Sequence, residues 1–450
     1  MKPARFARRA RGALQRRLAP LAAARRDGHG LLAPLRELLA LRLGPTRLSS
    51  LEYHAMHLCD RQMHPNPEGA LYGGLWFKEW VHAQLNNPRW EGMATDKLSM
   101  YALFRQLRLP HPEVLALATP QPRRHGDVPV LASREALVDF LRHSRDYPLF
   151  CKPVKGSKAA GSHRIERYDA ARDELLLAGG ERVSPLSFAA GLDDPTGFGV
   201  LFQRALSAAP ETRPLCGPTI AGCRVIMLLD DDGAKPFKAT WKIPVGSNFI
   251  DNYWAGRSGN LAGSLDLDSG RVQRVVRGIG RNLSECPRHP DTGAQLPGVQ
   301  LPRWRETLAL LRRAAESFPG FRWQHWDVGL SADGPVLFEL NSAGAVDLTQ
   351  LAEGTGIYDR ELREFIARHG RRRPRGGLLF PGRGSDQRRG ARGVEPPPLA
   401  QSHSVPPISL RGGDPQNTRP DSRPDSQPGT RAKSGSARRD AELAGELSGD

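Results

Sequence analysis

The most informative segment of this chain of 450 residues is WDVGLSADGPVLFELNSAG, residues 326–344. Two apolar runs, 325–330 and 335–341, flank a short polar segment, and this pattern predicts a β-hairpin. Asp327, Glu339 and Asn341 carry the oxygen ligands that Mg²⁺ prefers. Glu339 and Asn341 end a very apolar strand, where polar side chains without a ligand are hard to explain. The sequence therefore predicts a metal site on this hairpin.

The turn decides whether these oxygen ligands meet. Glu339 and Asn341 are two residues apart, so they share one face of a strand. A two-residue turn that ends at Gly334 would pair Asp327 with Leu340, on the wrong face. A three-residue loop with Gly334 in the left-handed conformation pairs Asp327 with Glu339, and we expect this loop. The alternative is an ordinary hairpin with polar residues on its solvated face, which explains Asp327 better than the other two.

A second candidate site is CKPVKGSKAAGSHRI, residues 151–165. Lys152 belongs to an apolar strand, and the loop behind it contains Gly156, Ser157, Gly161 and Ser162. Such a loop lets backbone N–H groups and a lysine approach phosphate oxygens closely. It is not a Walker A loop, because GxxxxGK[ST] is absent. The alternative is a hairpin with a solvated basic tip.

Two further cations are candidates for binding an anion. Lys97 lies at the start of a helix that Thr95 or Asp96 can cap. Arg224 lies on the apolar strand 222–229, where an arginine is costly unless it pairs with an anion. A structural salt bridge is the alternative explanation for Arg224.

Segments with helical and strand spacing alternate along residues 95–369, which predicts an α+β body. We expect a basic helical segment at 1–50, an N-terminal subdomain at 51–94, two subdomains at 95–206 and 207–370, and a disordered tail at 371–450. The tail is rich in Gly, Pro, Ser and Arg and lacks the apolar residues for a core, so it should be dispensable for ligand binding.

The net charge of +17 comes from the two ends of the chain. Residues 1–50 contain 12 Lys/Arg against 2 Asp/Glu, and residues 371–450 contain 15 against 9, so the remaining body carries only +1. A nucleic-acid-binding fold would carry its basic patch on the folded domain, so no nucleic-acid partner is expected. The N-terminal helix could lie on an anionic membrane, or its leucines at 31, 35, 38 and 39 could pack against the body.

The five cysteines form no CxxC, and no apolar run is long enough to span a membrane or to serve as a secretory signal. We therefore expect a cytoplasmic protein with reduced thiols.

In their order along the chain, these pieces resemble the ATP-grasp superfamily: TDK at 95–97, a strand–Lys–Pro element with a glycine-rich loop, a strand ending in a Gln hinge, the Arg224 strand and the Asp…Glu-x-Asn hairpin. The resemblance covers residues 95–366 and extends to D-alanine–D-alanine ligase and ribosomal-protein glutamate ligases. Residues 240–272 look closer still to the sugar-transfer-associated ATP-grasp group, which is associated with bacterial surface-polysaccharide genes.

The resemblance implies two α+β subdomains that grip ATP between them, and it implies a role for each candidate residue. Lys97 and Lys152 would hold the phosphates, and Arg224 would face the γ-phosphate or an acyl-phosphate. The flap over the phosphates would be Gly156, Ser157 and Gly161. The hinge at adenine would run from Gln203 to Leu206, with Gln203 as the side-chain partner. The Mg²⁺ ligands would be Asp327, Glu339 and Asn341.

One position departs from the family pattern. Several relatives carry a catalytic arginine two residues before the metal-binding aspartate, where this chain has His325. Arg224, Lys242 or Arg257 would then supply the missing positive charge.

The resemblance implies an ATP- and Mg²⁺-dependent carboxylate–amine ligase that acts through an acyl-phosphate in envelope or surface-polysaccharide synthesis. Its partners would be ATP, an unknown carboxylate and an unknown nucleophile, and either of the two unknown substrates could be linked to a glycan. The N-terminus would make weak contact with the inner membrane. Two alternatives remain: a phosphotransferase with a hydroxyl acceptor on the same fold, and a non-catalytic nucleotide-binding scaffold.

Overall fold

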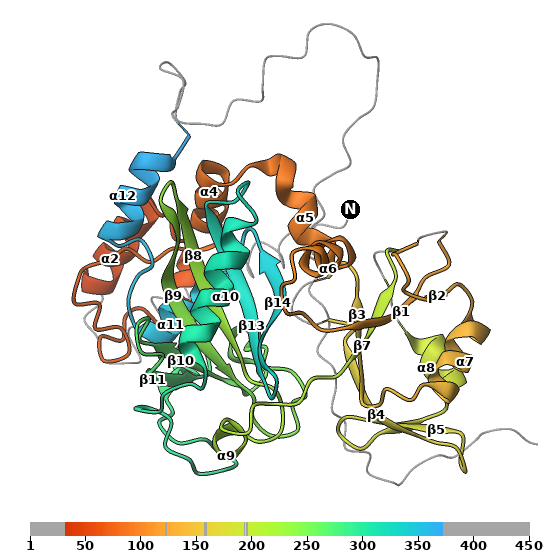
Figure 1. Cartoon of the computed structure of the whole chain (residues 1–450). Coiled ribbons are helices and arrows are strands. Elements are labelled where there is room, and N and C mark those ends of the chain that lie inside the picture. Colours follow the sequence, from red (N-terminus) through yellow and green to blue (C-terminus); the bar gives the residue numbers. More distant parts are fainter. Residues whose placement is uncertain (1–31, 122–123, 157–159, 193, 195–196, 372–450) are drawn as a thin grey trace, which may run out of the picture. The chain divides into compact units, whose positions relative to one another are not determined.

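A computed structural model describes residues 32–371, except for 122–123, 157–159, 193 and 195–196. The expected disordered tail lies outside the described residues apart from Arg371, as do Ser157 and the first 31 residues of the basic N-terminal segment. The described part of the chain forms two seven-stranded sheets with helices packed against them (Figure 1), so the α+β prediction is confirmed. None of its helices is long and apolar enough to cross a membrane.

The first sheet has the strand order β2-β1-β7-β3-β4-β5-β6. Its strands are β1 Val114–Ala118, β2 Val130–Leu131, β3 Leu149–Pro153, β4 His163–Asp169, β5 Glu174–Leu177, β6 Arg182–Val183 and β7 Val200–Arg204. The helices α7 (Arg134–His143) and α8 (Pro185–Gly191) pack against it and against each other. Leu137 and Leu141 lie one turn apart on α7, so both reach the sheet core, while Ser133 caps the helix.

The second sheet has the order β12-β11-β10-β9-β8-β13-β14. Its strands are β8 Gly222–Asp230, β9 Gly233–Ile243, β10 Leu261–Leu265, β11 Val272–Arg277, β12 Ser284–Glu285, β13 Trp323–Ser331 and β14 Gly334–Asn341. The connecting segments contain the helices and 3-10 turns η1 Pro88–Trp90, α5 Glu91–Thr95, α6 Lys97–Gln106, α9 Arg213–Cys216, η2 Trp254–Gly256 and η3 Gly280–Asn282.

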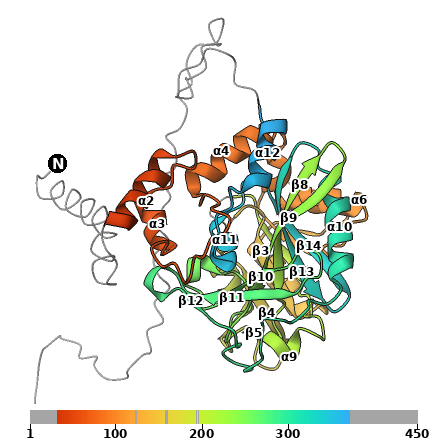
Figure 2. The same ribbon diagram turned by 90° about the vertical axis from the view of Figure 1, so that its left-hand side faces the viewer.

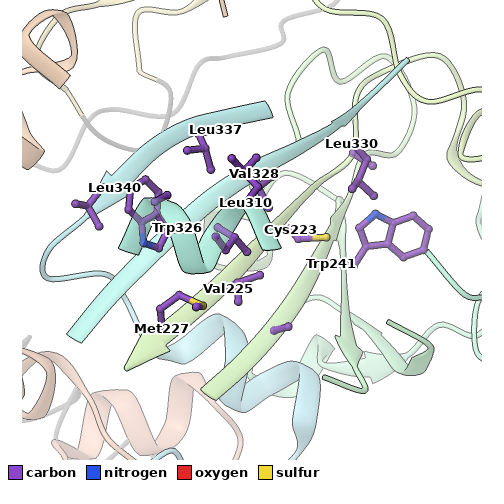
Figure 3. Close-up of a cluster of buried hydrophobic side chains, with 14 of the residues drawn as sticks. Cys223, Val225, Met227, Trp241, Leu310, Trp326, Val328, Leu330, Leu337 and Leu340 are labelled. Carbon is purple, nitrogen blue, oxygen red and sulfur yellow. The ribbon is translucent and has the colours of Figure 1, made fainter. Parts of the chain in front are cut away.

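One face of the second sheet is apolar and is covered by α10 (Trp304–Glu316). Alternate residues of β8 and β13 point to this face, and Figure 3 shows them packed around Leu310 of α10: Cys223, Val225, Met227, Trp326, Val328 and Leu330. Because side chains alternate along a strand, Arg224 and Asp327 point to the opposite face. The apolar core therefore forces these two charged residues onto the same side of the sheet.

Helices from both ends of the described chain cover the opposite face. They are α2 (Leu32–Leu43), α3 (Ser50–Ala55), α4 (Leu75–Leu85), α11 (Asp347–Glu353) and α12 (Arg360–His369). Figure 2 shows α10 and α11 on opposite sides of this sheet. Leu41 and Leu48 pack the N-terminal region onto β10 and β11. The alternative in which leucines 31, 35, 38 and 39 pack against the body holds for Leu38 but not for Leu35 and Leu39, which are exposed. Leu31 lies outside the described residues.

The hairpin β13–β14 pairs Asp327 with Glu339, as predicted, but for a different reason. The turn has two residues, since Ser331 pairs with Gly334, and the expected three-residue loop does not form. A bulge restores the predicted register: Val328 pairs with Leu337, so Phe338 is the extra residue of β14. The bulge turns Phe338 and Glu339 toward one cavity although they are adjacent in sequence.

Candidate functional site

A cavity of about 610 Å³ lies between the first sheet and the polar face of the second. Its walls come from strands β3, β7, β8, β9, β13 and β14, from helices α3, α4 and α11, from the start of α6 and from neighbouring loops. Ten of the predicted site residues line it: Lys97, Lys152, Gly156, Gln203, Leu206, Arg224, Lys242, Asp327, Glu339 and Asn341. Gly161 is not among the lining residues, and Ser157 lies outside the described residues. Residues up to 244 positions apart in the sequence thus meet at one site.

Asp327 lies at the centre of a charged network on the cavity floor. Its two carboxylate oxygens accept hydrogen bonds from Nε and Nη2 of Arg224 at 2.9 and 2.8 Å. Lys242 Nζ is 3.5 Å from the same carboxylate and 3.2 Å from Asp251. Asp251 in turn accepts a hydrogen bond from the backbone N–H of Gly222 at 2.9 Å. Two cations and two carboxylates therefore balance each other in a largely buried cluster.

These neighbours shift the protonation equilibria of the cluster. Burial by itself raises the pKa of Asp327, but Arg224 and Lys242 outweigh it and hold that pKa well below its usual range. Burial lowers the pKa of Lys242, yet Asp251 and Asp327 more than compensate and raise it. The pKa of Asp251 is raised by burial and by Asp327, against the effect of Lys242. At neutral pH the Asp327–Arg224 pair is fully ionised.

Glu339 and Asn341 present oxygen atoms to the cavity above this network. Asn341 Nδ2 donates to Glu339 Oε1 at 3.2 Å, which orients the amide so that its carbonyl oxygen is left available. Glu339 Oε2 is 3.5 Å from Lys97 Nζ. These oxygen donors and the Asp327 carboxylate form the ligand set that suits Mg²⁺, so the residues present fit a magnesium ion. Asp327 would have to exchange part of its contact with Arg224 and Lys242 for the metal.

The two lysines reach the cavity from different elements. Lys97 begins α6, whose N-cap Asp96 accepts from Ser99 N, and its Nζ donates to the Gly156 carbonyl at 3.0 Å. Lys152 Nζ donates to the Tyr101 hydroxyl at 2.8 Å. Burial lowers the pKa of Lys152 to about 8, although Glu339 and Asp327 act in the opposite direction. Lys152 is therefore a cation whose charge depends on pH close to neutrality.

This pKa predicts the pH dependence of nucleotide binding. Lys152 is mostly protonated below pH 8 and loses its charge above, so the affinity for ADP should fall as the pH rises through about 8. K152R should remove this fall, because a guanidinium stays charged. Calorimetric titrations with ADP between pH 7 and pH 9 measure the effect, with K155R as control, since Lys155 packs over Phe198 and does not line the cavity. A wild-type affinity that is flat across pH 8 would contradict this role.

The end of β7 forms another edge of the cavity, where the resemblance places the adenine hinge. Residues 203–206 all line the cavity. Gln203 is 1% exposed, and its Nε2 donates to the Pro112 carbonyl at 3.3 Å. The glycines of the expected flap differ in backbone conformation. Gly156 has an extended φ of 158°, whereas Gly161 has φ 70°, a left-handed value that favours glycine. The Gln203 side chain is thus engaged with the protein, as are the backbone N–H groups of Arg204 and Ala205, which donate to the carbonyls of Glu113 at 3.3 Å and Pro148 at 2.9 Å.

His325 does not take the place of the arginine found in relatives. It is fully buried under Gly344, where a Cβ atom would lie 2.3 Å from its ring, and it does not line the cavity. Burial and the nearby Arg224 hold its pKa well below the ordinary value, so the ring is neutral. Of the three expected substitutes, Arg224 and Lys242 line the cavity and contact Asp327, whereas Arg257 is exposed and is not among the lining residues.

Several lining residues were missed by the sequence reasoning. Glu52 accepts from the backbone N–H of Leu75 at 2.5 Å, where Gly74 permits the approach because a Cβ would lie 2.3 Å from the carboxylate. Lys78 donates to the Ala343 carbonyl at 3.1 Å and so holds the segment after Asn341. In the sequence, the adjacent glycines at 73 and 74 were the one signal that the chain makes a close contact here. The other missed lining residues include Asp251, Asn252, Trp254 and Asp347.

Comparisons with known proteins identify a family. The model of the family described as "Sugar-transfer associated ATP-grasp" matches residues 78–365. No curated protein matches the chain. Among solved structures, the ATP-grasp ligase PsnB in complex with a minimal precursor is 20% identical with a TM-score of 0.33, and the match covers 63% of each chain. This chain thus spans less than two thirds of the length of PsnB.

Two further solved structures are similar at lower identity. D-alanyl-alanine synthetase A from Vibrio cholerae is 12% identical with a TM-score of 0.36, covering 63% of this chain and 68% of that one. D-alanine–D-alanine ligase from Helicobacter pylori is 11% identical with a TM-score of 0.37, covering 64% of each chain.

Proposed function

The chain belongs to the sugar-transfer associated ATP-grasp family and has the ATP-grasp fold, and from that premise we propose that it is an ATP- and Mg²⁺-dependent ligase that joins a carboxylate to an amine or a related nucleophile. One observation carries the proposal: two lysines, an arginine and three oxygen ligands from five separate elements converge on one cavity. The alternative explanation of Arg224, a purely structural salt bridge, does not account for Lys97, Lys152 and Glu339 lining the same cavity.

Each residue has a separate task in this proposal. Lys97 and Lys152 would bind the phosphates, and the oxygens of Asp327, Glu339 and Asn341 would hold Mg²⁺. When bound, Mg²⁺ offsets the negative charge of the transferring phosphoryl group. Arg224 donates hydrogen bonds from Nε and Nη2 to Asp327, and its Nη1 has no partner among the described residues. That N–H group is available to an oxyanion on the substrate.

The proposed reaction has two steps. A substrate carboxylate oxygen attacks the γ-phosphorus, the bond to the bridging oxygen breaks, and ADP leaves, which gives an acyl-phosphate. The amine then attacks the acyl carbon, the carbon–oxygen bond to phosphate breaks, and inorganic phosphate leaves as the amine loses a proton. Arg224 stabilises the oxyanion of the second step. The family description, which mentions sugar transfer, supports a substrate connected with sugar transfer. We propose that this substrate belongs to surface-polysaccharide or envelope synthesis.

The test is a screen of acids and amines for ADP release, followed by product analysis. A carboxylate labelled with ¹⁸O should transfer one labelled oxygen to inorganic phosphate if an acyl-phosphate forms. A phosphorylated acceptor without free phosphate would instead identify a phosphotransferase. Nucleotide binding without any turnover would identify a scaffold.

We also propose weak peripheral contact with anionic membranes through the N-terminal region. Exposed Arg36, Arg42 and Arg47 lie in or beside α2, which also exposes Leu39 and Leu43. A basic surface with exposed leucines suits an anionic lipid headgroup layer, with about 1 kcal/mol from each basic residue near the surface.

Vesicle co-sedimentation tests this contact. Wild-type protein should pellet with vesicles that contain anionic lipid and should pellet less as salt is raised, because screening shortens the Debye length to about 8 Å at physiological ionic strength. R36E/R42E/R47E should pellet several-fold less. The matched control is R134E/R167E/R172E, three charge reversals on exposed arginines of the first sheet region. Equal pelleting of both triple variants, or no dependence on lipid charge, would refute the membrane contact.

A further inference from the structure

The loop between β9 and β10 builds one wall of the cavity beyond the charged network. All six residues from 249 to 254 line the cavity. Asp251, in the middle of this run, contacts Lys242 at 3.2 Å and thereby connects the loop to Asp327. The residues that follow it in the loop, Asn252 to Trp254, therefore lie close to the proposed reaction centre.

A buried asparagine holds this loop in place. Asn260 is 0% exposed, and its amide nitrogen donates to the carbonyls of Ile250 and Asn252, both at 2.9 Å. Its carbonyl oxygen accepts from the Val245 N–H at 3.0 Å. Tyr253 is also buried, and its hydroxyl donates to the Gly278 carbonyl. Buried hydrogen bonds thus fix the backbone of Ile250 and Asn252 and the side chain of Tyr253 in this wall.

Trp254 is the unusual residue of this wall. It is 38% exposed, it lines the cavity, and its backbone has φ 46°, a value that a bulky side chain rarely adopts. Within the described part of the chain, no aromatic ring or cation packs on its indole ring. Trp76 has the same exposure, but its ring stacks on Trp80 at 6.1 Å and carries Arg47 at 4.7 Å. Trp76 has protein partners for its ring, whereas Trp254 lines the cavity with no such partner among the described residues.

Two polar groups that have no hydrogen-bond partner among the described residues belong to side chains that line the same cavity. Asn252 Oδ1 accepts from the Trp254 N–H at 3.0 Å, which leaves the amide nitrogen of Asn252 free among the described residues. Asp347 Oδ1 accepts a hydrogen bond from the Leu348 N–H at 2.9 Å, and its Oδ2 has no hydrogen-bond partner among the described residues. Both residues line the cavity, and Asp347 is close enough to Arg224 and Tyr253 to influence their ionisation.

We propose that Trp254, Asn252 and Asp347 form a subsite for a pyranose ring carried by one of the two substrates. A pyranose has an apolar C–H face, which suits an indole, and hydroxyl groups at its edge, which need both donors and acceptors. The asparagine amide supplies a donor and the aspartate an acceptor beside the ring. The subsite rests on the proposed ligase function and specifies the class of its substrate as a sugar.

Saturation-transfer NMR with full-length protein tests the subsite. The probes are the methyl glycosides of glucose, N-acetylglucosamine and glucuronic acid, each added with ADP and Mg²⁺, with a blocked alanine dipeptide as the non-sugar probe. We expect at least one glycoside to receive saturation at its ring protons. W254A should weaken its binding about tenfold or more, W254F should restore most of it, and W76A should match the wild type. Calorimetry with ADP on the same samples should give one affinity for all four proteins.

The outcomes separate the subsite from the ligase proposal. If the wild type binds ADP but no glycoside, or if W254A binds the glycoside as well as the wild type does, the subsite is wrong and the ligase proposal stands. The subsite is also wrong if W76A loses binding equally, or if the dipeptide alone depends on Trp254. If the wild type does not bind ADP, the ligase proposal itself fails.

Discussion

E339Q is expected to lower ATP turnover about 10²–10³-fold while the protein stays folded. Glu339 provides the carboxylate closest to Lys97 and orients Asn341, so a neutral side chain removes one negative ligand from the proposed magnesium site. Glutamine keeps the size of glutamate and can still accept the hydrogen bond from Asn341, so the melting temperature should stay close to that of the wild type. Steady-state ADP release across a Mg²⁺ titration measures the effect, and the midpoint should move to higher Mg²⁺.

The matched control is E353Q on α11. Glu353 is also a carboxylate paired with a lysine, Lys238 at 3.1 Å, but it does not line the cavity. E353Q should therefore turn over ATP at the wild-type rate. Wild-type turnover by E339Q at every Mg²⁺ concentration would show that Glu339 is not a metal ligand.

The residue types of the site could be predicted from the sequence because each one breaks a local rule. Arg224 interrupts an apolar strand, and Glu339 and Asn341 end another, so burial without a partner would be costly. The face on which they lie followed from alternation along the strands, since the apolar residues at 223, 225 and 227 had to face α10. These inferences need only the residues within one strand.

The parts that could not be predicted depend on contacts between distant segments. The Arg224–Asp327 pair joins residues 103 positions apart, and no local pattern links them. The bulge at Phe338 produced the predicted register by a route that turn composition does not reveal. The left-handed conformation of Trp254 and the hydrogen bonds from Asn260 depend on the whole loop, so the place of this cavity wall could not be predicted, although residues 240–272 resembled the family.

D327N is expected to destabilise the protein by about 3–5 kcal/mol, because it leaves Arg224 and Lys242 facing each other in a largely buried site with one carboxylate fewer. The side chains of Arg224 and Asp327 are only 17% and 8% exposed, so solvent screens the pair weakly. Neighbouring cations depress the folded-state pKa of Asp327, so its contribution is complete above the unfolded-state pKa of about 4 and is lost as pH falls through the folded-state value. The loss in D327N should therefore be the same at pH 6 and pH 8.

Urea denaturation measures this loss as a lower midpoint with an unchanged slope. The informative control is R224M/D327L, which removes both charges and fills the space with apolar atoms, while Lys242 keeps Asp251 at 3.2 Å. Replacing both partners of a buried pair is often nearly neutral, so the double variant should recover most of the stability that D327N loses. It should nevertheless remain inactive, because the guanidinium proposed to stabilise the oxyanion is gone. If the free energy of unfolding of D327N falls by less than about 1 kcal/mol, or if R224M/D327L is the less stable of the two, the expectation is wrong. The charges at this site are then stabilised mainly by solvent rather than by each other.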